Sequence, residues 1–127
     1  MSSAGCVVVV DDDPVVTRML ELALRAADLE VVTTNRSFGV LNLIASTKPE
    51  VVIMDLMMPG LDGAELTDLI RRDPDTAGAV VIMYSAADES TLEQRGRQCG
   101  ADAWLPKTTR PSALVSEVMR WISLGRG

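Results

Sequence analysis

The chain has 127 residues, 47% of them hydrophobic and 3% aromatic, and it carries a formal net charge of −6 at pH 7. We therefore expect a single domain over residues 1–127, with a core at about 5–123 built mainly from aliphatic side chains. The acidic balance disfavours direct binding to nucleic acid, because the backbone phosphates would repel the chain.

Short apolar runs alternate with longer segments of helical periodicity along the whole chain. The first run, Cys6 to Val10, is β-branched in four of its five positions and shows no polar alternation. Such a run is typical of a strand whose two faces are both covered. The runs predict strands at 6–10, 30–34, 51–54, 79–84 and 101–105.

The segments between and after these strands predict helices at 14–27, 37–47, 63–72, 88–99 and 111–123. Asp13 before Pro14 is typical of an N-cap and a first helical residue, and Asp62 with Glu65 has the spacing of a capping box. The fourth helix has few apolar residues, and its interior Gly96 costs about 1 kcal/mol relative to alanine. We expect this helix to dock weakly and to be able to move.

Five successive strand–helix units indicate the α/β class, with a parallel sheet whose helices cover both faces. Open sheets of this kind bind ligands at the carboxyl ends of their strands. The residues that follow four of the predicted strands are acidic, hydroxylated or basic. They are Asp11 and Asp12 after the first strand, Asp55 after the third, Ser85 after the fourth and Lys107 after the fifth.

These residues have the chemistry of a magnesium-assisted phosphoryl-transfer site. Three carboxylates close together raise one another's pKa values, and a bound divalent cation relieves that repulsion. The chain has no histidine, and Cys6 and Cys99 lack the spacing of metal ligands, so the hard oxygen ligands predict Mg²⁺, with Mn²⁺ as a substitute. A phosphoryl group then fits between the cation and Lys107, and the carboxylate that faces both is the candidate nucleophile.

The two cysteines lie in apolar surroundings, as is typical of reduced thiols that act as small buried hydrophobic residues. No apolar run is long enough to span a bilayer, and the first residues lack the basic and then apolar pattern of a secretion signal. We therefore expect a cytoplasmic protein without membrane insertion.

Four segments at the predicted strand ends resemble the response-regulator receiver domains of two-component signalling, of the chemotaxis-regulator type. They are VVVVDDDP (7–14), VVIMDLMMPGLDG (51–63), VVIMYSA (80–86) and GADAWLPK (100–107). The resemblance implies a flavodoxin-like receiver fold, which is a doubly wound, five-stranded parallel sheet in the order 2-1-3-4-5 with five helices. Pro59, Gly60 and Gly63 are expected to shape the loop and the helix start in the second segment.

The same resemblance implies a signalling function. A receiver takes a phosphoryl group from a histidine kinase or a histidine phosphotransfer protein and then changes its partner-binding surface, here around residues 86–105 and the last helix. Its output is a downstream effector protein or an attached output domain. It is not an enzyme that acts on other molecules, because it catalyses only its own phosphorylation and dephosphorylation.

The roles of the acidic residues follow from the resemblance position by position. Asp55 is the implied phosphoacceptor and, together with Asp12, a direct ligand of Mg²⁺. Asp11 is implied to reach the cation through a bound water. The backbone carbonyl of Met57 is implied to complete the ligands that the protein supplies.

Three further residues receive roles in the same way. Lys107 is implied to pair with the acceptor carboxylate and then with the phosphoryl group, Ser85 to be the switch hydroxyl, and Trp104 to be the switch aromatic residue. The chain departs from the family around the lysine. Family members usually place a proline directly after it, whereas here Pro106 precedes Lys107 and Thr108 follows it.

Other functions that share parts of this pattern fit less well. An Asp-nucleophile phosphatase of the haloacid-dehalogenase type needs a second aspartate two residues after the nucleophile, where this chain has Met57. A flavodoxin-like flavin module needs a Ser/Thr/Gly-rich phosphate loop where residues 11–13 are aspartates, and Met57 and Pro59 argue against an EF-hand. A degenerate receiver that binds proteins without phosphorylation is the alternative that the sequence leaves open.

Overall fold

Five strand–helix units follow one another in the computed structural model, which describes residues 5–58 and 62–125. In chain order the elements are β1 (Cys6–Val10), α1 (Pro14–Ala26), β2 (Glu30–Thr34), α2 (Val40–Thr47), β3 (Val51–Met54), α3 (Gly63–Arg72), β4 (Val80–Ser85), α4 (Glu89–Cys99), β5 (Ala103–Pro106) and α5 (Pro111–Leu124). The strands pair in parallel in the order β2-β1-β3-β4-β5, which confirms the predicted sheet and its strand order.

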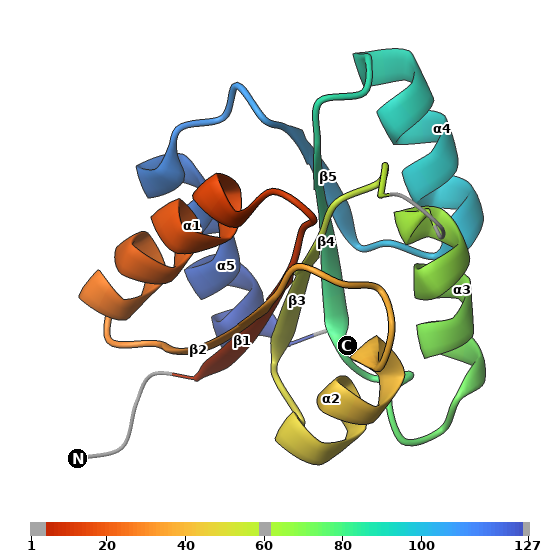
Figure 1. Ribbon diagram of the computed structural model, residues 1–127, viewed down its shortest axis with the longest axis horizontal. Coiled ribbons are helices and arrows are strands. Elements are labelled where there is room, and N and C mark those ends of the chain that lie inside the picture. The colour runs from red at the N-terminus through yellow and green to blue at the C-terminus, as the bar shows by residue number, and fades with distance from the viewer. Residues whose placement is uncertain (1–4, 59–61, 126–127) are drawn as a thin grey trace.

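Helices cover both faces of the sheet, with α1 and α5 on one face and α2, α3 and α4 on the other (Figure 1). Alternate residues of the central strands face these two layers. In β1, Val7 and Val9 lie in a core cluster with side chains of α1 and α5, whereas Val8 and Val10 lie in a second cluster with α2, α3 and α4. All four valines are fully buried, so both faces of β1 are covered, as the unbroken apolar run predicts. Among the described residues, no helix combines the length and the apolar character that crossing a bilayer requires.

Two aspartates cap the N-termini of helices that follow loops at the sheet edge. Asp13 Oδ1 accepts the backbone N–H of Val15 at 2.9 Å where α1 begins. Asp62 Oδ1 accepts the backbone N–H of Glu65 at 2.8 Å where α3 begins. Both predicted caps are confirmed, and each fixes the helix that follows an acidic loop.

Gly63 brings the start of α3 against the end of β3. Its N–H donates to the carbonyl of Leu56 at 2.7 Å, and a Cβ at this position would collide with the backbone carbonyl of Asp55. Glycine alone allows so close an approach, which fits the loop-shaping role expected of Gly63. Pro59 and Gly60, to which the same role was given, lie outside the described residues.

Two element boundaries differ from the prediction by more than one residue. The helix α2 begins at Val40 rather than at position 37, because Gly39 has a left-handed φ of 80° that interrupts a right-handed helix. The strand β5 begins at Ala103 rather than at position 101. The side chain of Asp102 accepts the N–H of Val81 at 2.9 Å, so a carboxylate occupies the place of a backbone carbonyl at the start of that strand.

The helix α4 packs on the sheet through Trp104 of β5. Gly96 is buried, and a Cβ built on it would lie 2.7 Å from Trp104 Cε3. The guanidinium of Arg97 lies over the indole ring, 5.2 Å from its centroid, and Arg95 pairs with Asp62 of the α3 cap at 2.5 Å. Gly96 therefore has a packing role, because the absence of a side chain makes room for the indole of Trp104.

Gly96→Ala should destabilise the chain, although alanine favours an isolated helix by about 1 kcal/mol. The new methyl group would press into the Trp104 ring, and overpacking of this kind costs about 1–3 kcal/mol. Urea unfolding measures the change, with Gly78→Ala as the control because Gly78 has open space around it. Equal or higher stability of Gly96→Ala would mean that the indole moves aside without cost.

Candidate functional site

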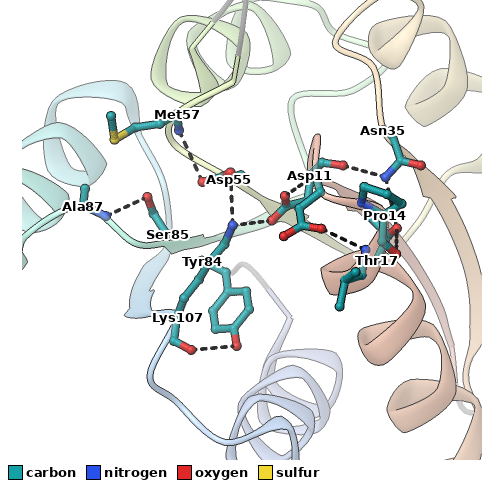
Figure 2. A network of polar contacts seen from close by, with 12 residues as sticks. Asp11, Pro14, Thr17, Asn35, Asp55, Met57, Tyr84, Ser85, Ala87 and Lys107 are labelled. Atoms are coloured by element: carbon teal, nitrogen blue, oxygen red, sulfur yellow. Dashed lines mark hydrogen bonds and ion pairs between the residues drawn. The ribbon is translucent and has the colours of Figure 1, made fainter.

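The carboxyl ends of four strands bring acidic, hydroxyl and ammonium groups to one edge of the sheet. Asp11 follows β1, Asp55 follows β3, Ser85 ends β4, and Lys107 follows β5. These strands are parallel neighbours, so their ends meet. Figure 2 shows the Lys107 side chain extending to a point between Asp11 and Asp55.

Lys107 joins two buried carboxylates. Its Nζ lies 2.8 Å from Asp11 Oδ2 and 3.2 Å from Asp55 Oδ2. Asp11 is only 2% exposed and Asp55 only 4%. Buried carboxylates this close repel each other strongly, and the ammonium between them offsets the repulsion. One positive charge thus balances part of the charge of two acids.

Burial raises the pKa of the Asp11 carboxyl, and the charge of Asp55 adds to the rise, whereas hydrogen bonds from Lys107 and from the backbone of Asp13 oppose it. The balance leaves the pKa of Asp11 above its ordinary value. For the Lys107 ammonium, burial lowers the pKa, but the hydrogen bond to Asp11 and the charges of both acids outweigh burial and raise it. Lys107 therefore stays charged at neutral pH.

Asp11 is held by a residue that the sequence analysis did not single out. Its backbone carbonyl accepts a hydrogen bond from Asn35 Nδ2 at 2.8 Å, and Asn35 also donates to Thr17 Oγ1 of α1 at 3.0 Å (Figure 2). The other carboxylate oxygen of Asp11, Oδ1, accepts the N–H of Asp13 at 2.9 Å. Asn35 follows β2, so the rule that points to strand ends could have found it.

Asp11, Asp12 and Asp55 form a cluster that could hold a metal ion. One carboxylate oxygen from each lies within 4.8 Å of the others. Asp12 is exposed, whereas Asp11 and Asp55 are buried, so the cluster opens to solvent on the side of Asp12. A set of oxygen ligands suits a hard divalent cation.

Of the remaining predicted site residues, Met57 and Ser85 lie at the same edge of the sheet as this cluster, whereas Trp104 lies apart from it. The N–H of Met57 donates to Asp55 Oδ1 at 3.3 Å. Ser85 is fully buried, and its Oγ accepts the N–H of Ala87 at 3.2 Å in the loop that leads to α4. Trp104 does not join the acids, because it packs on α4. The sheet edge therefore gathers every predicted site residue except Trp104.

Tyr84 is a second residue that the sequence analysis did not single out. It is 2% exposed, and its Oη lies 3.2 Å from the carbonyl oxygen of Thr109 and 3.4 Å from that of Lys107. Its signal in the sequence is a hydroxyl within an apolar strand, where burial calls for a hydrogen-bond partner. The identity of that partner depends on the fold, so the sequence could not supply it.

A model of the response regulator receiver domain family matches residues 7–119. The DNA-binding response regulator MtrA of Mycolicibacterium smegmatis is 30% identical over 88% of this chain and 48% of MtrA. The protein PilG of Pseudomonas aeruginosa is 32% identical over 88% of this chain and 83% of PilG. The structure of the chemotaxis protein CheY4 of Vibrio cholerae aligns with a TM-score of 0.83 at 26% identity, over 91% of this chain and 96% of CheY4. The chain thus spans about half the length of MtrA but most of PilG.

The stability advantage of Asp11→Asn over the wild-type chain should grow as the pH rises above the ordinary aspartate pKa in metal-free solution. The folded Asp11 carboxyl keeps its proton to a higher pH than the unfolded one. The folded state therefore binds more protons in the window between the two pKa values, and the free energy of unfolding falls as the pH rises through it. Asparagine removes this loss.

Urea unfolding with a chelator between about pH 3 and pH 6 covers the windows of both a raised and a lowered aspartate pKa, and the chain has no histidine to titrate there. Asp88→Asn is the control of opposite sign. Hydrogen bonds lower the pKa of Asp88, and the largest contribution comes from the backbone N–H of Thr91. The ionised form of Asp88 therefore stabilises the fold. A difference between Asp11→Asn and the wild-type chain that stays flat or falls with rising pH would contradict the account.

Proposed function

Because this chain belongs to the response regulator receiver domain family, we propose that it takes a phosphoryl group onto Asp55 in a Mg²⁺-dependent reaction and then changes the surface that its partners bind. The donor is a histidine kinase or a histidine phosphotransfer protein. The chain acts on itself alone, since it catalyses only its own phosphorylation and dephosphorylation. A downstream effector protein or an attached output domain reads the change.

The position of Asp55 in the sheet is the observation that carries this proposal. The strand β3 lies between β1 and β4, so Asp55 has the β1 carboxylates on one side and Ser85 on the other. The oxygens of Asp11 are engaged at 2.9 and 2.8 Å, whereas those of Asp55 make longer contacts of 3.3 and 3.2 Å. The Asp55 carboxylate is therefore less restrained than that of Asp11, and Asp55 is the one whose strand neighbours the strand of the Ser85 hydroxyl.

The transfer needs a nucleophile, a leaving group and a partner for the developing charge. An oxygen of Asp55 attacks the phosphorus of a phosphohistidine, and a P–O bond forms while the P–N bond breaks and the imidazole leaves with the bonding electrons. The Lys107 ammonium, which lies 3.2 Å from Asp55 Oδ2, balances charge on the transferred group. The sequence contains no histidine, so another protein or domain must supply the phosphohistidine.

The acidic cluster suits Mg²⁺, because its ligand atoms are carboxylate oxygens. We assign Asp12 and Asp55 as direct ligands, Asp11 as a ligand through a water, and the Met57 backbone carbonyl as the remaining protein ligand. The contact of Asp11 Oδ2 with Lys107 supports the indirect role of Asp11. When bound, the cation neutralises the carboxylates and offers positions to a phosphoryl oxygen.

Ser85 and Trp104 would carry the change away from the acceptor. Ser85 Oγ would turn from the N–H of Ala87 toward the phosphoryl group, and the loop into α4 would follow. Trp104 packs on Gly96, so a movement of α4 would alter that contact. The surface over α4, β5 and α5 is therefore the proposed site of output.

The exposed side of α1 offers a surface for the phosphoryl donor. Val15, Met19 and Leu22 are 74%, 37% and 55% exposed, and they line an apolar groove together with Pro14 and Pro111. Pro14 begins α1 just after the acidic loop, and Pro111 begins α5 just after the turn that follows β5, so the groove borders the acceptor's edge of the sheet. A donor must bring its phosphohistidine to that edge, and an exposed apolar surface beside it suits protein docking.

Acetyl phosphate with Mg²⁺ should add one phosphoryl group to the wild-type chain and none to Asp55→Asn. Asparagine preserves the size of the side chain but is a much poorer nucleophile. Intact-mass spectrometry measures the adduct, circular dichroism checks the fold, and Asp68→Asn on α3 is the control that should label like the wild type. An adduct of unchanged yield on Asp55→Asn would refute the acceptor, and an unlabelled wild-type chain would favour the degenerate receiver.

Asp12→Ala should weaken Mg²⁺ binding more than Asp11→Ala, since a direct ligand contributes more than one that acts through water. Calorimetric titration of both variants measures the affinities. Asp13→Ala is the control from the same loop. It should leave the Mg²⁺ affinity nearly unchanged while lowering the free energy of unfolding by about 1 kcal/mol through the lost helix cap. A dominant effect of Asp13→Ala on Mg²⁺ would show that the ligands are assigned in the wrong register.

Leu22→Glu should slow phosphorylation by a protein donor without changing the rate with acetyl phosphate. The new charge would oppose apolar docking on α1, whereas a small donor does not need that surface. Any histidine kinase or phosphotransfer protein that labels the wild-type chain can serve as the donor. Leu124→Glu, which changes an exposed leucine at the end of α5, is the control. Equal slowing with both donors would contradict the docking surface.

A further inference from the structure

The turn that carries Lys107 must hold a long side chain across a neighbouring strand. Lys107 follows β5, yet its Nζ reaches acids that follow β3 and β1, so the side chain passes the end of β4. Lys107 and Thr108 are the central residues of a turn that is closed by a hydrogen bond from the N–H of Thr109 to the carbonyl of Pro106 at 2.9 Å. Thr108 is exposed, and unlike proline it does not restrict its own φ.

The last two residues of β4, Tyr84 and Ser85, both form hydrogen bonds with this turn. The backbone N–H of Lys107 donates to the carbonyl of Ser85 at 2.9 Å. The hydroxyl of Tyr84 lies 3.2 Å from the carbonyl of Thr109 and 3.4 Å from that of Lys107, the two carbonyls that flank Thr108. The phenol has one proton, which these two acceptors share, with Thr109 the nearer. Figure 2 shows the ring of Tyr84 beside the Lys107 side chain, with its hydroxyl directed at the Lys107 carbonyl.

Tyr84 is well suited to hold this turn in place. The residue is 2% exposed and lies in the core cluster of α1 and α5, so the hydroxyl is held by closely packed surroundings. Burial raises the pKa of the phenol, which keeps it protonated and able to donate. A phenylalanine would fill the same space without donating, so packing alone does not account for the hydroxyl.

We propose that Tyr84 is a positioning residue for Lys107, whose hydroxyl anchors the turn at residues 107–109 and so places the ammonium between Asp11 and Asp55. The importance of this placement for phosphorylation rests on the function proposed above. The placement itself is a property of the folded chain and can be measured without any phosphoryl donor. A lysine stem has four carbons and many rotamers, so a looser turn would spread the ammonium over several positions.

The test is Tyr84→Phe, read first by NMR of the lysine side chains. The chain has two lysines, Lys107 and the exposed Lys48, so Lys48 is an internal reference in every spectrum. We expect the Lys107 Cε and Nζ resonances to move toward those of Lys48 in Tyr84→Phe, and the backbone amide of Lys107 to exchange faster with solvent. Thr76→Val is the matched control, because it removes a buried hydroxyl that lies 2.8 Å and 3.3 Å from two backbone carbonyls far from the site.

The second readout is the rate of phosphorylation by acetyl phosphate at saturating Mg²⁺. Tyr84→Phe should slow it by about tenfold, as expected when a supporting contact behind a charged group is lost. In a Lys107→Ala background the same substitution should have no further effect, because Tyr84 acts through the lysine. Thr76→Val should leave the rate unchanged in both backgrounds.

Unchanged Lys107 resonances in folded Tyr84→Phe would overturn the inference, as would a rate loss that persists in the Lys107→Ala background. A wild-type chain that takes no phosphoryl group would contradict the proposed function alone, and the NMR comparison would still decide the role of Tyr84.

Discussion

The contact of one lysine with two buried aspartates is the constraint on which the rest of this structure depends. Asp11 and Asp55 are almost fully buried, and ionised carboxylates in such a place require a cation near them. Lys107 meets that need from the far side of β4, at 2.8 and 3.2 Å. A divalent cation bound by the acidic cluster and a phosphoryl group on Asp55 would change the charge that this lysine balances. The same contact can therefore stabilise the resting chain and respond to phosphorylation.

The arrangement of the core places this chemistry at the carboxyl edge of the sheet. Both faces of the sheet are covered by helices, and the strands between them present apolar side chains to each layer. The buried acids Asp11 and Asp55 and the buried hydroxyl of Ser85 lie where strands end. The caps at Asp13 and Asp62 begin the helices that follow two of these loops. The close approach of Gly63 to Asp55 shows how little space separates the acceptor from α3. Acids gathered in this way lower stability until a cation binds, which is a common feature of functional sites.

The sequence was sufficient for the strands, the sheet order and the groups at the sheet edge, because unbroken apolar runs and strand-end residues are local signals. It was insufficient where a side chain acts through tertiary contact. The sequence indicates only that Gly96 lowers helix propensity, whereas the structure places the indole of Trp104 against it. The Asp102 carboxylate replaces a backbone carbonyl as the acceptor of the Val81 N–H, so β5 begins at Ala103 rather than at position 101. Asn35 follows a strand, so the strand-end rule could have placed it at the site, but the hydrogen-bond partners of Asn35 and of Tyr84 depend on the fold and are not local signals.

The most direct measurement is a crystal structure of the chain with Mg²⁺ and beryllofluoride, which stands in for the phosphoryl group. The account predicts beryllium bonded to an oxygen of Asp55, with Lys107 and Ser85 Oγ in contact with the fluorines and Mg²⁺ bound by Asp12, Asp55 and the Met57 carbonyl. Ser85 Oγ should have left the N–H of Ala87, and the packing of Trp104 on α4 should have changed. Beryllofluoride bound to another carboxylate, or bound to Asp55 without contact to Lys107, would contradict the account.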